Sequence, residues 1–213
     1  MTGLRISEIF FSLQGETRTV GWPTVFVRLT GCPLRCSYCD TTYAFRGGEK
    51  RSLDAVMDEI RRYRTRFVTV TGGEPLAQKN CLLLLDRLAA EDFQVSLETS
   101  GALDISDVNE KVVVVMDLKT PSSGEAHKNR YENIEHLDAK DQVKFVISDA
   151  LDYEWSKEKV RQYSLADRCE VLFSPNCARV QPVELADRIL HDQLPVRFQI
   201  QLHKHLWGDV PGK

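Results

Sequence analysis

Short apolar segments alternate with amphipathic segments along most of the chain. The apolar segments have the length of strands and are rich in β-branched and aromatic residues, which favour strands. They cover residues 24–29, 67–71, 93–98, 112–116, 143–147, 170–173 and 196–201. The run from Val112 to Met116 is apolar throughout, as is typical of a parallel strand that is covered on both faces.

Apolar residues at helical spacing separate several of these segments. Leu53, Val56 and Ile60 recur at that spacing directly after Ser52, which predicts a helix with a serine cap. Three further helices are expected, at residues 80–89 with Asn80 as the cap, at 152–163 and at 183–190. Residues 126–141 are polar and irregular, and they indicate only a helix or a long loop.

The alternation of strands and helices predicts an α/β protein whose parallel strands are joined by right-handed crossovers. Seven short strands in 213 residues are too few for a barrel of eight full units, so we expect an incomplete barrel of about six units. A flavodoxin-like open sheet is the alternative. With 42% hydrophobic residues the chain can bury its core as a single domain, residues 1–213, although two domains are not excluded.

Polar segments follow directly after most of the predicted strands. The carboxyl ends of parallel strands meet at one edge, where α/β barrels and open sheets build their active sites. The segments concerned are residues 31–42, 71–75, 98–101, 117–124 and 174–177. We therefore expect them to surround one site.

Three of the six cysteines lie close together, at Cys32, Cys36 and Cys39. Four thiolates would complete a zinc site or an iron–sulfur cube, whereas three leave one metal position open. No fourth ligand is at hand, since the next histidine is His127. The pattern favours an iron–sulfur cube with one iron free for a chelating ligand, and the alternatives are a structural zinc loop, a disulfide and ordinary buried thiols.

Composition and charge indicate which classes of binding partner to expect. A net charge of -3 gives no overall basic field for a nucleic-acid backbone, so a small-molecule substrate is expected and a nucleic-acid partner is not. The apolar runs are too short to cross a bilayer, and the N-terminus lacks the apolar core of a secretory signal. We expect a cytoplasmic protein without a membrane partner, because thiols stay reduced in the cytoplasm.

Arg28 is the one charged residue in the segment 24–29. A buried arginine needs a partner, and its planar guanidinium suits a carboxylate. That carboxylate belongs either to a substrate or to another residue of the chain, and the sequence favours neither.

The cysteine spacing resembles that of the radical S-adenosylmethionine enzymes, in which the free iron binds the amino and carboxylate groups of S-adenosylmethionine. Residues 72–75, Gly-Gly-Glu-Pro, are similar to the motif that holds the amino group in these enzymes. With residues 13–16, 98–101 and 117–119, the chain resembles the 7-carboxy-7-deazaguanine synthase family over nearly its whole length. Thr17 departs from this pattern, since the family commonly has glycine there.

The resemblance implies an incomplete (β/α)6 barrel of the radical S-adenosylmethionine type, usually a homodimer. The implied activity is conversion of 6-carboxy-5,6,7,8-tetrahydropterin to 7-carboxy-7-deazaguanine with loss of ammonia, in 7-deazapurine and queuosine biosynthesis. The implied cofactors are a [4Fe-4S] cluster, S-adenosylmethionine and Mg2+, with an electron donor such as flavodoxin. The alternatives are an activase that places a glycyl radical on a partner protein, and a zinc-binding module without catalysis.

The resemblance also assigns roles to residues, none of them as a catalytic side chain. It places the cluster on Cys32, Cys36 and Cys39, and the magnesium ion on Thr41. It places the substrate on Leu13, Gln14, Gly15, Arg28, Thr71 and Lys213. It places S-adenosylmethionine on Tyr38, Gly73, Glu98, Lys119, Pro121, Ser122, Ser174, Pro175, Asn176 and Cys177. His203 and His205 receive no role from it.

Overall fold

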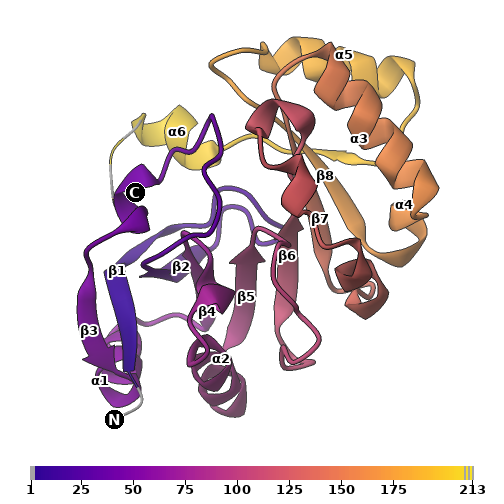
Figure 1. Ribbon diagram of the computed structural model, residues 1–213. Coiled ribbons are helices and arrows are strands. Elements are labelled where there is room, and N and C mark those ends of the chain that lie inside the picture. Colours follow the sequence, from indigo (N-terminus) through magenta and orange to yellow (C-terminus); the bar gives the residue numbers. More distant parts are fainter. Residues whose placement is uncertain (1–2, 209, 211, 213) are drawn as a thin grey trace.

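The computed structural model describes residues 3–208, 210 and 212, which form one sheet of nine strands (Figure 1). The strand order is β3-β1-β2-β4-β5-β6-β7-β8-β9. The strands are Gly3–Leu13 (β1), Pro23–Leu29 (β2), Glu49–Ser52 (β3), Phe67–Gly72 (β4), Gln94–Thr99 (β5), Val113–Asp117 (β6), Gln142–Ile147 (β7), Glu170–Pro175 (β8) and Arg197–Phe198 (β9). Neighbours from β2 to β9 are parallel, and β1 pairs with β2 and β3 in antiparallel fashion.

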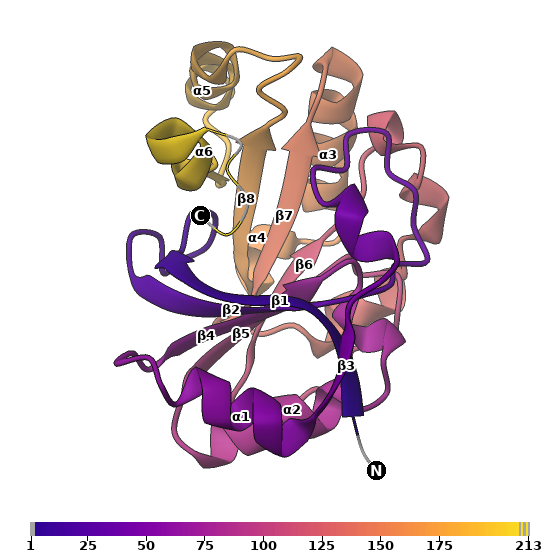
Figure 2. The same ribbon diagram turned by 90° about the vertical axis from the view of Figure 1, so that its left-hand side faces the viewer.

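The order of the parallel strands decides between the two expected architectures. A flavodoxin-like sheet reverses its strand order at a switch point, whereas the parallel strands β2 and β4 to β9 here follow one another in chain order. The sheet curves, and Figure 2 shows α1 and α2 on one side of the strands β1 to β5 and α6 on the other. The expected incomplete (β/α)6 barrel is therefore confirmed, with β2 and β4 to β8 as its six strands.

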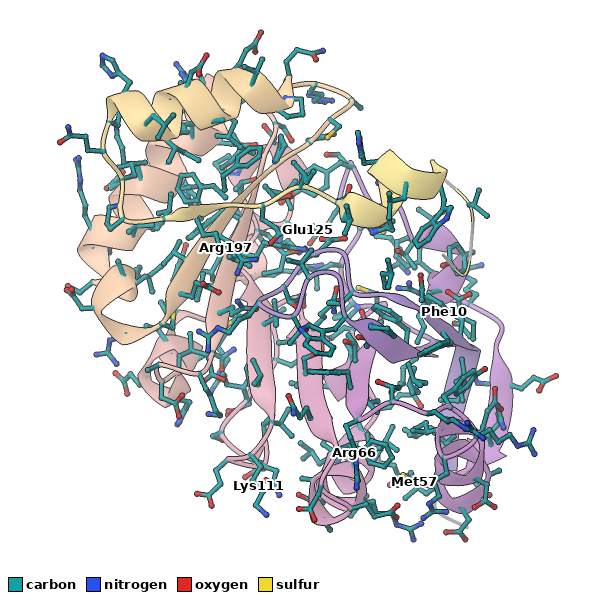
Figure 3. The ribbon with its side chains drawn as sticks, turned by 180° about the vertical axis from the view of Figure 1, so that it is seen from behind. Phe10, Met57, Arg66, Lys111, Glu125 and Arg197 are labelled. Carbon is teal, nitrogen blue, oxygen red and sulfur yellow. The ribbon has the colours of Figure 1, made fainter. Side chains whose placement is uncertain are left out.

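The helices cover the sheet in two groups. They are Leu53–Ile60 (α1), Cys81–Ala90 (α2), Ala150–Gln162 (α3), Leu165–Arg168 (α4), Pro182–His191 (α5) and Leu202–Trp207 (α6). Helices α1 and α2 pack on the first strands through apolar side chains such as Met57, labelled in Figure 3, which is 1% exposed. Helices α3 to α5 pack on β6 to β8, where the fully buried rings of Phe145, Tyr153 and Phe173 meet.

One of the two expected helix caps is formed. Ser52 Oγ accepts a hydrogen bond from Ala55 N at 3.1 Å, as predicted for the start of α1. Asn80 lies at the N-cap position of α2, as expected, but its side chain makes no capping hydrogen bond. Its amide donates instead to Gly3 O at 2.9 Å. Asn80 therefore ties the start of α2 to the start of β1.

Three parts of the chain differ from expectation or were not anticipated. Residues 196–201 form a strand only at Arg197–Phe198. Gln199 still donates through its N to Phe173 O at 2.9 Å, and its side chain donates to Gly15 O at 3.2 Å. Helix α6 follows directly. The edge strand β3, Glu-Lys-Arg-Ser, has no apolar alternation that would have predicted it. Residues 126–141 contain the 3-10 helices Ala126–Lys128 and Tyr131–His136.

The loop between β1 and β2, residues 14–22, extends across the open side of the barrel. Arg18 donates from its backbone N to Gln142 Oε1 at 3.1 Å and from its guanidinium to Ala139 O at 3.1 Å. Arg197 Nη2 donates to Thr17 O at 3.1 Å, and Leu202 N donates to Gly15 O at 3.1 Å. This loop therefore connects the first strand to the last segments of the chain.

None of the described helices combines the length and the apolar character that crossing a bilayer requires.

Candidate active site

A cavity of about 940 Å3 opens at the carboxyl ends of the parallel strands. Its wall brings together most of the residues selected from the sequence, which come from six strands (β1, β2, β4, β5, β6 and β8) and the loops after them. These residues are Leu13, Gln14, Gly15, Arg28, Cys32, Cys36, Tyr38, Cys39, Thr41, Thr71, Gly73, Glu98, Lys119, Ser174, Pro175, Asn176 and Cys177. Pro121 and Ser122 do not line the wall, and Lys213 lies outside the described residues.

The three clustered cysteines share one loop, and its backbone is fixed at several points. Cys32, Cys36 and Cys39 are half-buried and free of disulfide bonds. Gly31 N donates to Ala44 O at 2.8 Å, and Cys39 N donates to Cys36 O at 3.2 Å. Because the three thiols are partly exposed on one cavity wall, they are available to a metal centre held in that cavity.

A single metal ion does not fit these thiols. A structural zinc ion requires its ligands about 2.3 Å from one point. Among the described residues, no group of three or more His, Cys, Asp or Glu side chains converges in this way. Cys32, Cys36 and Cys39 all line the same cavity, where each thiol can bind a different iron of a cluster.

Pro121 and Ser122 support the cysteine loop from outside. They belong to the 3-10 helix Pro121–Ser123, and Ser37 donates through Oγ to Ser122 O at 2.6 Å. Ser122 in turn donates through its N to Asp152 Oδ1 at 2.9 Å, at the start of α3. The position of the loop is thereby linked to the helix that covers β7 and β8.

The Gly-Gly-Glu-Pro segment lies against the cysteine loop. A Cβ atom at Gly73 would lie 2.3 Å from Gly31 O and 2.8 Å from the Cys32 Cβ, so only glycine fits there. Gly73 N donates to Leu29 O at 3.2 Å, and Glu74 N donates to Gly31 O at 2.7 Å. The backbone of this segment therefore fixes the start of the cysteine loop.

The Glu74 side chain is fully buried and faces the protein interior. Its carboxylate accepts hydrogen bonds from Thr99 Oγ1 at 2.9 Å, from Ser100 N at 2.7 Å, from Ser100 Oγ at 2.5 Å and from Leu76 N at 3.0 Å. Glu74 does not line the cavity. It joins the ends of β4 and β5 and so holds two cavity loops at a fixed separation.

The cavity floor carries a network of buried charges. Lys144 Nζ lies 2.9 Å from Glu16 Oε2 and 3.7 Å from Asp117 Oδ2. Lys119 Nζ lies 2.8 Å from the same Asp117 oxygen. Glu98 accepts from Gln14 Nε2 at 3.3 Å and from Thr71 Oγ1 at 3.1 Å.

Burial and neighbouring charges shift the pKa values of this network in different directions. For Lys144, burial alone would lower the pKa, but Glu16, Asp117 and Glu98 raise it well above its usual value. For Glu16 and Asp117, burial would raise the pKa, but the lysines outweigh it and lower the pKa of both carboxyl groups. Burial and the nearby Glu16 raise the pKa of Glu98.

One atom of this network has no partner within the described chain. Asp117 Oδ1 is buried and accepts no hydrogen bond from the described residues. An unpaired buried acceptor costs free energy unless a ligand or water supplies a donor. Since Asp117 lines the cavity, a bound molecule with hydrogen-bond donors can satisfy it.

Arg28 has an intramolecular partner and also lines the cavity. Its Nε donates to Glu8 Oε1 at 2.7 Å, and Tyr43 OH donates to the same oxygen at 2.7 Å. Its guanidinium lies 5.8 Å from the centre of the Phe10 ring. Among the described residues the two Nη groups make no hydrogen bond, so both are available to a ligand in the cavity.

Helix α6 and the residues before it complete the wall. His203 lines the cavity, and its Nδ1 would lie 2.6 Å from a Cβ at Gly15, so glycine is required for this contact. Gln201 donates to Glu16 Oε1 at 2.9 Å and to Asp40 Oδ2 at 3.3 Å. His205 is exposed and does not line the cavity.

Sequence reasoning missed several residues of the wall. Lys144 carried a usable signal, because a lone lysine within an otherwise apolar strand requires a partner just as Arg28 does. Asp117 and Glu16 were noted only as parts of motifs. Gln201 and His203 had no clear signal, since nothing in the sequence predicted that α6 folds back to Gly15.

Comparison with known proteins was made on the sequence and on the fold. A family model described as the radical SAM superfamily matches residues 26–172. A 7-carboxy-7-deazaguanine synthase of Koribacter versatilis is 42% identical, and the alignment covers 96% of this chain and 97% of that protein. A 7-carboxy-7-deazaguanine synthase of Chlorobaculum tepidum is 40% identical, with 96% and 94% covered.

Solved structures share the fold. The crystal structure of QueE from Escherichia coli superposes with a TM-score of 0.80 at 23% identity, over 94% of this chain and 95% of that one. A structure of TYW1 with a lysine-pyruvate adduct bound has a TM-score of 0.52 at 12% identity, over 79% and 73%.

Proposed function

Because the chain belongs to the radical SAM superfamily and, within it, to the 7-carboxy-7-deazaguanine synthase family, we propose that it converts 6-carboxy-5,6,7,8-tetrahydropterin to 7-carboxy-7-deazaguanine with loss of ammonia. The product would enter 7-deazapurine and queuosine biosynthesis. One observation carries the proposal. A single cavity joins the three cysteines, the charged floor and Arg28, so cluster, cofactor and substrate have adjacent places.

The superfamily uses a [4Fe-4S] cluster and S-adenosylmethionine, and the residues present fit both. Cys32, Cys36 and Cys39 would hold three irons of the cluster, which is supported by their free, half-buried thiols on one cavity wall. When bound, these cofactors supply the carbon-centred radical that removes a hydrogen atom from the substrate. The task of the chain is to orient both molecules and to exclude other hydrogen donors.

S-adenosylmethionine would lie beside the cysteine loop. The wall residues proposed for it are Tyr38, Gly73, Glu98, Lys119, Ser174, Pro175, Asn176 and Cys177, with Pro121 and Ser122 placed behind the loop. Gly73 supports this placement, since it brings a bare backbone to the cavity next to Cys32. Asp117 Oδ1 offers an acceptor at the same end.

The substrate would lie over the charged floor, against Leu13, Gln14, Gly15, Arg28 and Thr71, with Lys213 as a further expected contact. Arg28 supports this most directly, because its Nη groups would pair with the pterin carboxylate while Nε stays bonded to Glu8. Gln14 is already engaged, since its Nε2 donates to Thr69 and Glu98 and its Oε1 accepts from the Gly15 and Glu16 amides. We infer that Gln14 acts by placing Glu98 and Gly15.

Mg2+ would bind at Thr41 and the substrate carboxylate. Thr41 Oγ1 lies 2.9 Å from Asp40 Oδ1 on the cavity wall, which supplies the oxygen ligands that this ion prefers. Burial would raise the pKa of Asp40, but Lys204 outweighs it and lowers that pKa, so the carboxylate is charged at neutral pH. Product formation should fall on treatment with EDTA and return when Mg2+ is added.

The remaining expectations concern partners and organisation. Radical SAM enzymes need a reductant, and we propose a small electron-transfer protein such as flavodoxin. We also propose a homodimer of single-domain chains. The cytoplasm is the proposed location, because it keeps thiols reduced and would protect a cluster on Cys32, Cys36 and Cys39.

The test is anaerobic reconstitution with iron and sulfide, followed by incubation with S-adenosylmethionine, reductant, Mg2+ and 6-carboxytetrahydropterin. Mass spectrometry should detect 7-carboxy-7-deazaguanine. Formation of 5′-deoxyadenosine without this product would contradict the substrate and reopen the glycyl-radical activase. Bound zinc without iron or sulfide would contradict the enzyme altogether and favour a zinc-binding module.

A further inference from the structure

Three consecutive carbonyl groups of the cysteine loop accept hydrogen bonds from cations. Arg35 Nη1 donates to Cys32 O at 2.8 Å and to Leu34 O at 2.6 Å. Lys128 Nζ, from the 3-10 helix Ala126–Lys128, donates to Pro33 O at 2.8 Å. The positive charges thus lie on the side of this loop to which its carbonyl oxygens point.

The peptide group between Pro33 and Leu34 links one of these cations to a predicted cluster ligand. Its oxygen accepts from Lys128 Nζ at 2.8 Å, and its N–H belongs to Leu34. Burial raises the pKa of the nearby Cys32 thiol, and the Leu34 backbone opposes this by acting as a donor toward the sulfur. Hydrogen bonds in such a chain polarise one another, so a cation at the oxygen strengthens the N–H as a donor. The charge of Lys128 therefore reaches the Cys32 sulfur through a single peptide group.

Glu125 holds this arrangement in place. Its Oε1 accepts from Arg35 N at 2.8 Å, and its Oε2 lies 2.8 Å from Lys128 Nζ. Glu125 is buried, with 8% of its surface exposed. The carboxylate orients Lys128 toward the loop and places a negative charge beside it.

We propose that Lys128 is a positioning residue that raises the reduction potential of the cluster by acting through the Pro33–Leu34 peptide on Cys32. The inference rests on the proposed function in one respect, namely that Cys32 ligates an iron–sulfur cluster. Hydrogen bonds to the sulfurs and local charge are among the factors that set such potentials. A cluster that accepts one electron from the reductant gains a negative charge, and the cation stabilises that reduced state. Glu125 opposes this effect, so its charge lowers the potential.

Four variants test this inference on reconstituted full-length protein, by redox titration followed by electron paramagnetic resonance. Lys128→Met removes the charge, Lys128→Arg keeps it, and Glu125→Gln removes the opposing charge but keeps an acceptor for Arg35 N. Lys111→Met is the control for loss of one lysine, since Lys111 is exposed and lies far from Glu125 in Figure 3. Iron and sulfide content is measured for each protein.

At a fixed solution potential, Lys128→Met should lower the ratio of reduced to oxidised cluster about three- to tenfold, where tenfold corresponds to 59 mV for one electron. Glu125→Gln should raise that ratio, and Lys128→Arg and Lys111→Met should match the wild type. If Lys128→Met does not retain iron, Lys128→Gln gives the same comparison, because it keeps a donor without the charge. Equal potentials in the wild type and the uncharged Lys128 variant would overturn the inference while leaving the proposed function intact. A wild type that holds no reducible cluster would overturn both.

Discussion

Replacing Glu74 with Gln should destabilise the fold while leaving the cavity wall unchanged. The carboxylate is 0% exposed, and its two oxygens accept from two backbone N–H groups, those of Leu76 and Ser100, and from the hydroxyls of Thr99 and Ser100. A glutamine amide has a single oxygen. In either orientation of the amide, its NH2 group faces one of the two backbone N–H donors.

The expected loss follows from these contacts. A buried donor left without an acceptor costs about 1–3 kcal/mol. Hydrogen bonds to a charged acceptor are roughly twice as strong as neutral ones, so the bonds that remain also weaken. Together they predict a loss of about 3 kcal/mol in the free energy of unfolding. For a protein of this size that corresponds to a melting temperature lower by about 6–12 °C.

Thermal unfolding of the apoprotein, followed by circular dichroism under reducing conditions, measures this loss without interference from a cluster. Thr99→Val is the matched control, because valine has nearly the size of threonine but lacks the hydroxyl that donates to Glu74, and the carboxylate stays in place. We expect that control to lose only about 2–4 °C. A Glu74→Gln protein that melts within about 2 °C of the wild type would refute the reasoning. Well below its melting temperature, the variant should bind S-adenosylmethionine as the wild type does, since Glu74 does not line the cavity.

Further predictions follow from other contacts of the site. Arg28→Ala should reduce formation of the deazaguanine at least tenfold more than it reduces uncoupled cleavage of S-adenosylmethionine, as measured by product analysis. The control Glu8→Gln should change both reactions little. An equal loss of both reactions in Arg28→Ala would show that the arginine has a structural role. Cys36→Ala should lose the iron–sulfur absorbance and most bound iron, and an intact cluster with full activity would exclude Cys36 as a ligand. Glu98→Gln should raise the melting temperature at neutral pH but lower activity. In the folded state the pKa of Glu98 lies above its usual 4.5, so the ionised carboxyl destabilises the fold at pH values above the folded-state pKa. The gain in melting temperature from glutamine should therefore fade as the pH falls through the folded-state pKa. A gain that does not change with pH would contradict this assignment. Gly73→Ala should destabilise the protein by about 1–3 kcal/mol and weaken cluster retention, because its Cβ would lie 2.3 Å from Gly31 O; unchanged unfolding and iron content would show that the two segments separate freely.

The strand–helix order and the place of the site were predictable because each depends on local pattern. Period and composition located strands β2 and β4 to β8, and parallel strands bring their carboxyl ends to one edge whatever the loops between them do. The strand β1 was harder to recognise, since its residues from Ile6 to Leu13 are partly covered on both faces and do not alternate cleanly. The polar strand β3 is specified by its pairing with β1 alone.

The partners of buried charges could not be predicted from the sequence, because they are distant along the chain. Arg28 and Lys144 both need an acidic partner, but the sequence does not show which one. The register of β1 against β2 places Glu8 opposite Arg28, and Glu16 reaches Lys144 from the loop of residues 14–22. Glu74 illustrates the opposite case. Its motif suggested a side chain open to the ligand, and the structure turns that carboxylate toward Ser100, away from the cavity.

The loop of residues 14–22 has a mechanical consequence. In an incomplete barrel the edge strands β3 and β9 do not pair, so the two edges would be free to move apart and the width of the cavity would vary. Here Gly15 O and Thr17 O accept hydrogen bonds from Leu202 N and Arg197 Nη2. The loop of residues 14–22 therefore spans the open side of the barrel and fixes the curvature of the sheet. The strands of the barrel do not form a closed hydrogen-bond ladder, but these loop contacts close the ring, so the dimensions of the cavity depend on bonds outside the ladder.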